Sequence, residues 1–256
     1  MGCNFIEKFG FYDIIFIMHR FFIEDKLTVG NEAMIEGQEH LHLSNVLRQR
    51  VGSQIELICG DGNFYLSEIV EIGKKQTIVN VISKRKDNGG LNVPISVFMG
   101  LIRAEKMDLV VQKLTELGVS ELVPFVSAFN TAKASTNKRD RCLRISKEAC
   151  KQCGRADVME IGECIDFKQL LTRLAEFDLV LFAYENAKRL LSATLKELKP
   201  KKVCIIIGSE GGFSETEVNV LDKAGAKVIS LGKRVLRAET AAITAVSAVE
   251  VLLGEF

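Results

Sequence analysis

An apolar strand that runs directly into a glycine-rich turn constrains the fold of this chain more than any other feature. The segment I-I-I-G-S-E-G-G-F-S occupies residues 205–214, and a strand end with a basic loop, L-G-K-R-V-L-R-A-E-T-A-A, follows at 231–242. Both segments place exposed backbone amides at the C-terminal end of a strand, where open α/β sheets bind ligands. The spacing G-x-x-G-G matches neither the dinucleotide turn G-x-G-x-x-G nor the phosphate loop G-x-x-x-x-G-K-[ST]. We therefore predict an α/β protein in which these two loops close around one small molecule.

The sequence after Gly90 alternates between strand and helix patterns. Residues 95–101 form a continuous apolar run, as expected for a parallel strand that is buried on both faces. Residues 105–117 carry apolar side chains at helical spacing and are followed by Gly118, which suits a helix end. Further strands are predicted at 122–126, 178–183, 203–207 and 227–231, and further helices at 139–153, 167–177, 190–199, 215–224 and 239–253. This alternation predicts a doubly wound parallel sheet domain over residues 89–256.

Residues 18–88 have a different sequence pattern, which predicts a helix at about 39–50 followed by short strands. Apolar residues alternate at 54–59, 63–72 and 77–82 with Gly or Asp turns between them, which predicts a small antiparallel β-barrel. Residues 84–90 have the charge and glycine content of a linker. Residues 1–17 lack the basic start and the cleavage site of a signal peptide. We expect these residues to be a disordered upstream extension, with Met18 as the natural start.

Charge and cysteine content narrow the classes of partner. The net charge of +1 argues against a globally basic protein, but residues 131–155 hold eight Lys or Arg against two Asp or Glu. Such a segment suits a phosphate backbone, and a solvated helix face without a partner is the alternative. The chain has seven cysteines and no secretory signal, which indicates reduced thiols and a cytoplasmic protein. No apolar run approaches a membrane span, so no membrane partner is predicted.

The pair Cys150 and Cys153 raises the question of a metal or redox site. The pair lies late in a helical run, and no second cysteine pair stands at zinc spacing. Cys142, Ile145, Ala149 and Cys153 fall on one apolar helix face. Packing is therefore the favoured interpretation, and no metal is predicted.

Taken together, several segments resemble the SPOUT, or trefoil-knot, methyltransferases, which use S-adenosylmethionine (SAM). The segments are H-L-x-x-V-L-R at 42–48, K-M-D-L-V-V-Q-K-L-T-E-L-G-V at 106–119, E-A-C-K-Q-C-G-R at 148–155, and the two C-terminal loops. More closely, the chain from about Met18 onward is similar to the bacterial family that methylates N3 of a uridine in small-subunit (16S) rRNA. That family usually has Pro where this chain has Ser209, which still allows the turn.

The resemblance implies a knotted SPOUT-type domain at 89–256, preceded by a PUA-like RNA-binding barrel at 18–88. It further implies a homodimer that acts on 16S rRNA in the small ribosomal subunit. From the residues alone, two other functions stay open. One is a knotted methyltransferase that acts on a ribose 2′-hydroxyl or a tRNA base. The other is a non-catalytic RNA-binding assembly factor, which SAM binding would distinguish.

A SAM pocket needs glycines that let the backbone approach and an apolar slot for the adenine. The expected SAM-binding residues are Leu181, Phe182, Ile207, Gly208, Glu210, Gly211, Gly212, Leu231, Gly232, Val235, Leu236 and Thr240. Arg237 is the main catalytic candidate, because a guanidinium beside the transfer point would hold an RNA phosphate or the uracil carbonyl. Glu210 is the second candidate, facing the ribose or the sulfonium. Glu239 fits helix capping equally well.

The expected RNA-binding residues come from the N-terminal domain and the basic helix. They are Arg20, His42, Arg48, Lys138, Arg141, Gln152 and Arg155. Surface charge is the alternative for Arg20 and Arg48, and helix capping is the alternative for the helix end at 152–155. No residue stands out as a general base, so none is assigned.

Overall fold

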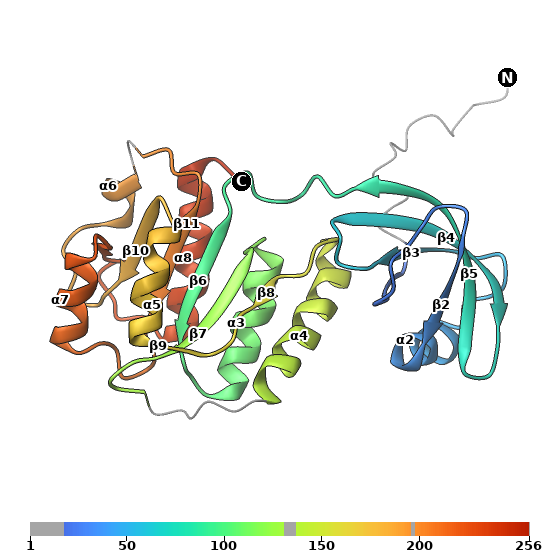
Figure 1. Cartoon of the computed structure of the whole chain (residues 1–256), viewed down its shortest axis with the longest axis horizontal. Coiled ribbons are helices and arrows are strands. Elements are labelled where there is room, and N and C mark those ends of the chain that lie inside the picture. The colour runs from blue at the N-terminus through green and yellow to red at the C-terminus, as the bar shows by residue number, and fades with distance from the viewer. Residues whose placement is uncertain (1–17, 131–136, 196–197, 256) are drawn as a thin grey trace, which may run out of the picture. The chain divides into compact units, whose positions relative to one another are not determined.

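The computed structural model describes residues 18–130, 137–195 and 198–255. These residues form two compact units (Figure 1). One unit contains the chain up to Asn88 together with Gly154–Asp157, and the other contains Gly89–Cys153 and the chain from Val158 onward. None of the helices in the described ranges has the length and apolar content that a membrane crossing requires.

The larger unit is built on a sheet in which every described strand pair is parallel. Its order is β12-β10-β11-β6-β7-β8, and β9 also pairs with β7. The strands are β6 (Ile95–Gly100), β7 (Glu121–Val126), β8 (Glu160–Ile161), β9 (Ile165–Asp166), β10 (Leu179–Ala183), β11 (Val203–Ile207) and β12 (Lys227–Ile229). The prediction of a parallel α/β sheet is confirmed. The knot implied by the resemblance remains a prediction.

Helices cover both faces of this sheet (Figure 1). They are α3 (Ala104–Glu116), α4 (Asn137–Cys153), α5 (Phe167–Arg173), α6 (Leu191–Leu195), α7 (Glu215–Lys223) and α8 (Ala238–Leu253), with a short 3-10 turn at Leu174–Glu176. Successive strand residues point to opposite faces. Ile205 therefore packs into the layer with α3, α6 and α8, whereas Ile206 packs into the layer with α5 and α7. Burial on both faces explains why the strands are continuous apolar runs.

The smaller unit is a curled five-stranded sheet in the order β1-β3-β4-β5-β2. Its elements are β1 (Arg20–Phe22), β2 (Glu32–Glu36), α2 (Gly37–Leu41), a π-helical turn at His42–Val46, β3 (Gln54–Ile58), β4 (Asn63–Ile72) and β5 (Gln76–Lys86). The pairs β3–β4, β4–β5 and β5–β2 are antiparallel as predicted, whereas β1 runs parallel to β3. Phe21, Leu43 and Ile69 are among its fully buried core residues.

Several predicted elements have different bounds in the structure. The helix expected at 39–50 ends at Val46, and the chain turns at Arg48, whose φ is 50°. Residues 84–86 continue β5, so the linker begins later than predicted, because these residues pair with β4. The helix expected at 190–199 is shorter, with α6 covering Leu191–Leu195. The strands β1, β2, β8 and β9 were not predicted; β8 and β9 have two residues each and β1 three, which carry too little periodicity to be recognised.

Candidate active site

A cavity of about 420 Å³ lies where β10, β11 and β12 end. Its walls are the segments that follow these strands, together with one side chain from α3 and the start of α8. The residues lining it are Lys106, Ala183, Tyr184, Glu185, Ile207, Gly208, Ser209, Glu210, Gly211, Gly212, Phe213, Ser230, Leu231, Gly232, Arg234, Val235, Leu236, Arg237, Ala238 and Ala241. The cavity therefore occupies the sheet edge at which open α/β proteins bind ligands.

The glycine-rich loop after β11 is packed so tightly that side chains do not fit. A Cβ on Gly211 would lie 2.5 Å from the carbonyl oxygen of Phe129, and a Cβ on Gly208 would lie 2.7 Å from the Phe213 ring. Gly212 has a φ of +68°, which glycine adopts without strain. On the neighbouring strand, a Cβ on Gly100 would lie 2.4 Å from the backbone nitrogen of Ser209. These glycines let the loop backbone itself form the cavity wall.

A capping box holds the far end of the same loop. Ser214 caps α7, with its side chain accepting from the Glu217 backbone N–H while the Glu217 carboxylate accepts from the Ser214 backbone N–H at 2.9 Å. The other oxygen of Glu217 accepts from the backbone N–H of Ala128 at 2.8 Å. A single buried carboxylate thus joins the glycine loop to the segment that follows β7.

Lys106 lies between two carboxylates at one end of the cavity. Its Nζ is 3.0 Å from Oε1 of Glu210 and 3.7 Å from Oε2 of Glu239. Burial acts to raise the pKa of the Glu210 carboxyl, but hydrogen bonds from its own backbone, from Lys106 and from the Arg103 backbone outweigh burial and lower it. Glu210 is therefore an anion at neutral pH and is poorly suited to accept a proton.

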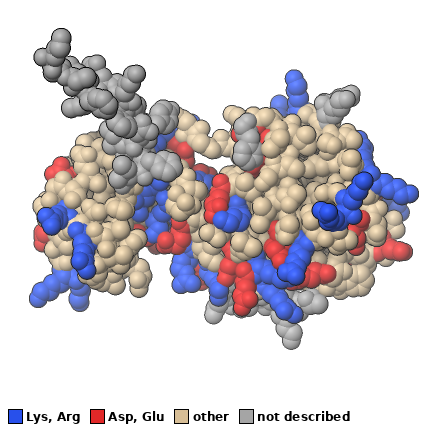
Figure 2. All heavy atoms as spheres, turned by 180° about the vertical axis from the view of Figure 1, so that it is seen from behind, with Lys and Arg blue, Asp and Glu red and all other residues tan. Residues whose placement is uncertain are grey.

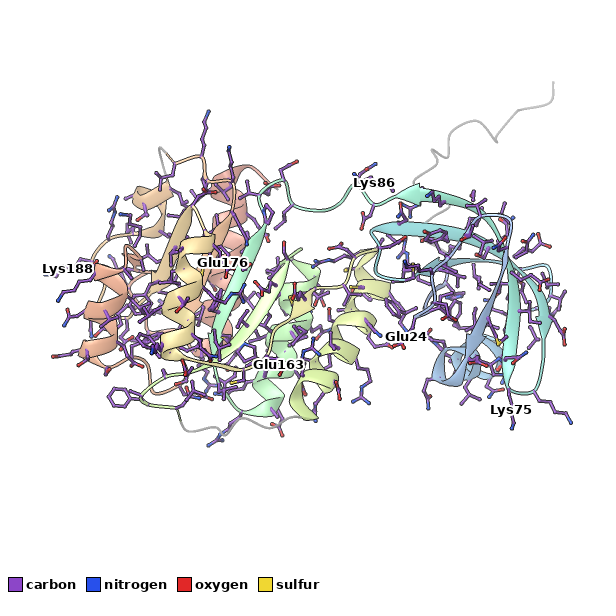
Figure 3. The ribbon with its side chains drawn as sticks, viewed as in Figure 1. Glu24, Lys75, Lys86, Glu163, Glu176 and Lys188 are labelled. Carbon is purple, nitrogen blue, oxygen red and sulfur yellow. The ribbon has the colours of Figure 1, made fainter. Side chains whose placement is uncertain are left out.

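The remaining charged residues of the cavity come from its loops. Arg234 and Arg237 are exposed, and Glu185 approaches Gly212. Lys188, in the same segment after β10, points outward into solvent and does not line the cavity (Figure 3). On the face seen in Figure 2, basic and acidic side chains of this unit are interspersed. No single large basic field covers the part of this unit that is visible in Figure 2.

Most of the expected cofactor-binding residues line the cavity. They are Ile207, Gly208, Glu210, Gly211, Gly212, Leu231, Gly232, Val235 and Leu236, and Arg237 lines it as well. Leu181 and Phe182 lie outside it, fully buried in β10, and the wall is formed instead by Ala183, Tyr184 and Glu185 directly after them. Thr240 is also outside the lining, whereas Ala238 and Ala241, three residues apart on α8, face the cavity.

Sequence reasoning did not identify Lys106, Tyr184, Glu185 or Arg234 as cavity residues. Tyr184 and Glu185 follow a predicted strand directly, so the rule that ligands bind beyond strand ends would have found them. Lys106 had no comparable local signal, because its partner Glu210 lies 104 residues away in the sequence.

The expected RNA-binding residues divide into paired and exposed side chains. Arg20 donates to the buried Glu56 at 2.7 Å, and Arg155, only 8% exposed, pairs with Asp157 at 2.8 Å. Arg20 thus links two strands of its own unit, Arg155 is held by a carboxylate two residues along the chain, and both offer little surface to a phosphate. Arg141 is exposed but bonded to Asp108. His42, Arg48 and Gln152 are exposed, and the side chain of Lys138 lies outside the described part of the structure.

The cysteine pair on α4 does not pack as one apolar face. Cys150 is fully buried, but Cys153 is exposed, which corrects its predicted place beside Cys142 and Ala149. The helix ends at Cys153, and its last turn buries Cys150 while Cys153 faces outward. Across the described ranges, no group of three or more His, Cys, Asp or Glu residues is arranged to hold a metal ion.

Comparison with known proteins identifies relatives along nearly the whole chain. Residues 90–250 match the family described as RNA methyltransferase domain, and residues 35–82 match the RNA methyltransferase PUA domain. Ribosomal RNA small subunit methyltransferase E of Bacillus subtilis (strain 168) is 33% identical, over 93% of this chain and 100% of its own length.

Two solved structures with bound cofactor have the same fold. A putative methyltransferase from Legionella pneumophila in complex with SAM has a TM-score of 0.83 and 30% identity, covering 91% of this chain and 97% of its own. A ribosomal RNA small subunit methyltransferase E from Neisseria gonorrhoeae bound to SAM has a TM-score of 0.84 and 26% identity, covering 92% and 98%.

Proposed function

The chain belongs to the ribosomal RNA small subunit methyltransferase E family, and from this membership we propose that it transfers the methyl group of SAM to N3 of a uridine in 16S rRNA. The observation that carries the proposal is the cavity formed by the two C-terminal loops in a chain of this family. The larger unit performs the transfer, and the smaller, PUA-like unit binds RNA.

The cavity residues fit SAM. Backbone groups of Gly208–Gly212 and of Leu231–Leu236 supply donors and acceptors for a neutral base and a ribose, while Ile207 and Ala241 supply apolar contact. A volume of about 420 Å³ lies within the range of cavities that hold small ligands. When bound there, SAM supplies a methyl group on a positively charged sulfur.

During methyl transfer the uracil loses its N3 proton, so the protein must stabilise the negative charge that develops on the base. Cations at fixed positions stabilise such developing negative charge. Arg237, exposed at the start of α8, lines the cavity, which supports the proposed role of holding a phosphate or a uracil oxygen. The target base must leave any helix, because its N3 edge is occupied in a base pair.

The working form of the enzyme is proposed to be a cytoplasmic homodimer that acts on the small ribosomal subunit. Val251 and Leu252 are exposed on α8, at 62% and 41%, and offer apolar area to a second copy. Light scattering that gives the mass of a single chain would contradict the dimer.

The direct test is methyl transfer from labelled SAM to small ribosomal subunits and to naked 16S rRNA. Nucleosides from the product are identified by mass spectrometry, and N3-methyluridine is the expected result. A 2′-O-methylated nucleoside would contradict the proposed target atom. Absence of both SAM binding and transfer would leave an RNA-binding protein instead.

A further inference from the structure

Lys106 is the charged side chain that α3 contributes to the cavity. It lies in the first turn of that helix, which follows β6, and β6 neighbours β11 on the side away from β10 and β12. Lys106 therefore enters the cavity from the side opposite the loops after β10 and β12. Its side chain is 29% exposed, so it remains accessible to a ligand.

Two carboxylates from different segments hold the ammonium group in place. Glu210 belongs to the glycine loop, and Glu239 to the first turn of α8. A lysine ammonium has three N–H donors. Glu210 accepts from one of them, and the oxygen of Glu239, at 3.7 Å, lies beyond ordinary hydrogen-bond length. At least one donor is therefore left for a ligand in the cavity.

The two carboxylates also balance the charge of the lysine. One ammonium beside two carboxylates leaves a local excess of negative charge, so Lys106 does not oppose the entry of a cationic sulfonium. By contrast, Arg234 and Arg237 are exposed, and no ion pair fixes either of them within the described residues. A donor fixed before the reaction stabilises developing charge better than a mobile one.

We propose that Lys106 is a catalytic residue that donates a hydrogen bond to O2 or O4 of the target uracil, an inference that rests on the proposed uridine-N3 reaction. In that step the N3 lone pair forms the bond to the methyl carbon, the electrons of the carbon–sulfur bond remain on sulfur, and the N3 proton leaves to water. Negative charge on the uracil spreads over O2 and O4, where the ammonium stabilises it.

The test compares full-length wild type and Lys106→Met with small ribosomal subunits as substrate. At pH 7 we expect kcat to fall on the order of 100-fold, as for the loss of one fixed donor to a developing anion. The SAM dissociation constant should change by no more than about threefold, because the interaction is made in the transition state. The kcat deficit should shrink as pH rises, because uracil then loses its N3 proton unaided.

Several other charged side chains face Lys106 or lie on its helix. They are Glu210 and Glu239 as its partners, Glu185, Arg234 and Arg237 in the cavity, and Glu105 and Asp108 on its own helix. Lys113→Met is the matched control: Lys113 lies on the same helix and pairs with Glu116 at 2.8 Å, away from the cavity. This control should retain wild-type turnover at every pH.

Two results would overturn the proposal. If SAM affinity falls as much as turnover, or if the deficit is the same at all pH values, Lys106 only holds the cavity segments together. Should Lys106→Met fail to fold because Glu239 is left unbalanced, the double variant Lys106→Met/Glu239→Gln gives the same readout. A wild-type enzyme that makes a nucleoside other than N3-methyluridine would overturn the proposed function itself, and that result needs no variant.

Discussion

Single residues decide how closely the backbone can surround the cavity. Gly208 and Gly211 are surrounded by atoms that a side chain would strike, and Gly212 has a backbone conformation that suits glycine. Ser209, where the family usually has proline, is nearly buried within the same loop. The loop therefore depends on its glycines for its shape, and the buried hydroxyl of Ser209 has no hydrogen-bond partner among the described residues.

Gly211→Val tests this dependence. The new Cβ would lie 2.5 Å from a backbone oxygen of Phe129, which cannot move as easily as a side chain, so the loop must shift. Overpacking of this kind costs about 1–3 kcal/mol, and we expect SAM affinity to fall by roughly tenfold or more. Calorimetric titration with SAM measures the effect. Gly90→Val, where no atom lies within 4 Å, is the control, and unchanged SAM binding by Gly211→Val would show that the pocket is misplaced.

Among the elements, α4 carries the concentrated basic charge of the chain. The structure divides that charge: Arg141 is bonded to Asp108, Lys151 pairs with Glu148, and Arg139 donates to the Ile161 carbonyl. Arg144 is exposed on the same helix. The helix is therefore less basic toward solvent than its sequence indicates, and Arg144 is the better candidate for a phosphate contact.

Arg144→Ala should weaken rRNA binding uniformly across sequences. Loss of one phosphate contact is expected to reduce the slope of log K against log salt by roughly one. Filter binding over a salt series measures this slope. The control is Lys223→Ala, which removes an exposed lysine at the end of α7 and should leave the slope unchanged. An unaltered slope for Arg144→Ala would show that Arg144 on α4 does not contact an RNA phosphate.

On the scale of the whole molecule, the C-terminus of α8 combines stabilising contacts with a destabilising one. Glu255 accepts hydrogen bonds from the backbone of Asn92 and Val93 and so anchors the start of the larger unit to its end. Glu250 is 2% exposed, and its Oε1 has no hydrogen-bond partner among the described residues. Burial, with a contribution from Glu255, raises the pKa of Glu250 to about 7.

Glu250→Gln should therefore stabilise the protein at high pH. Because the pKa in the folded chain lies above its ordinary value of 4.5, the free energy of unfolding decreases as pH rises through the interval from 4.5 to about 7. The variant should gain on the order of 2–3 kcal/mol at pH 8 and nothing below pH 4.5. Thermal unfolding at both pH values measures this, with exposed Glu160→Gln as the control. An equal gain in stability at both pH values would show that ionisation of Glu250 is not the cause.

The sequence by itself determined most elements of the larger unit and the position of the two cavity loops. A buried strand such as Val203–Ile207 is recognised from its continuous apolar run. The glycines that follow it indicate a loop whose backbone packs closely against its neighbours. These signals are local, because the side chains concerned are neighbours along the chain. The end of the helix at Val46 was missed because no glycine or proline marks it, since residues 38–51 contain neither.

Only the tertiary structure decided which distant side chains meet. Glu210 and Lys106 come together because β11 pairs with β6, and Arg20 meets Glu56 because β1 pairs with β3. An isolated lysine or arginine in a sequence looks the same whether it faces solvent, a carboxylate or a ligand. Its surroundings depend on strand order, which no local pattern encodes, and those surroundings separate a structural ion pair from a candidate catalytic group.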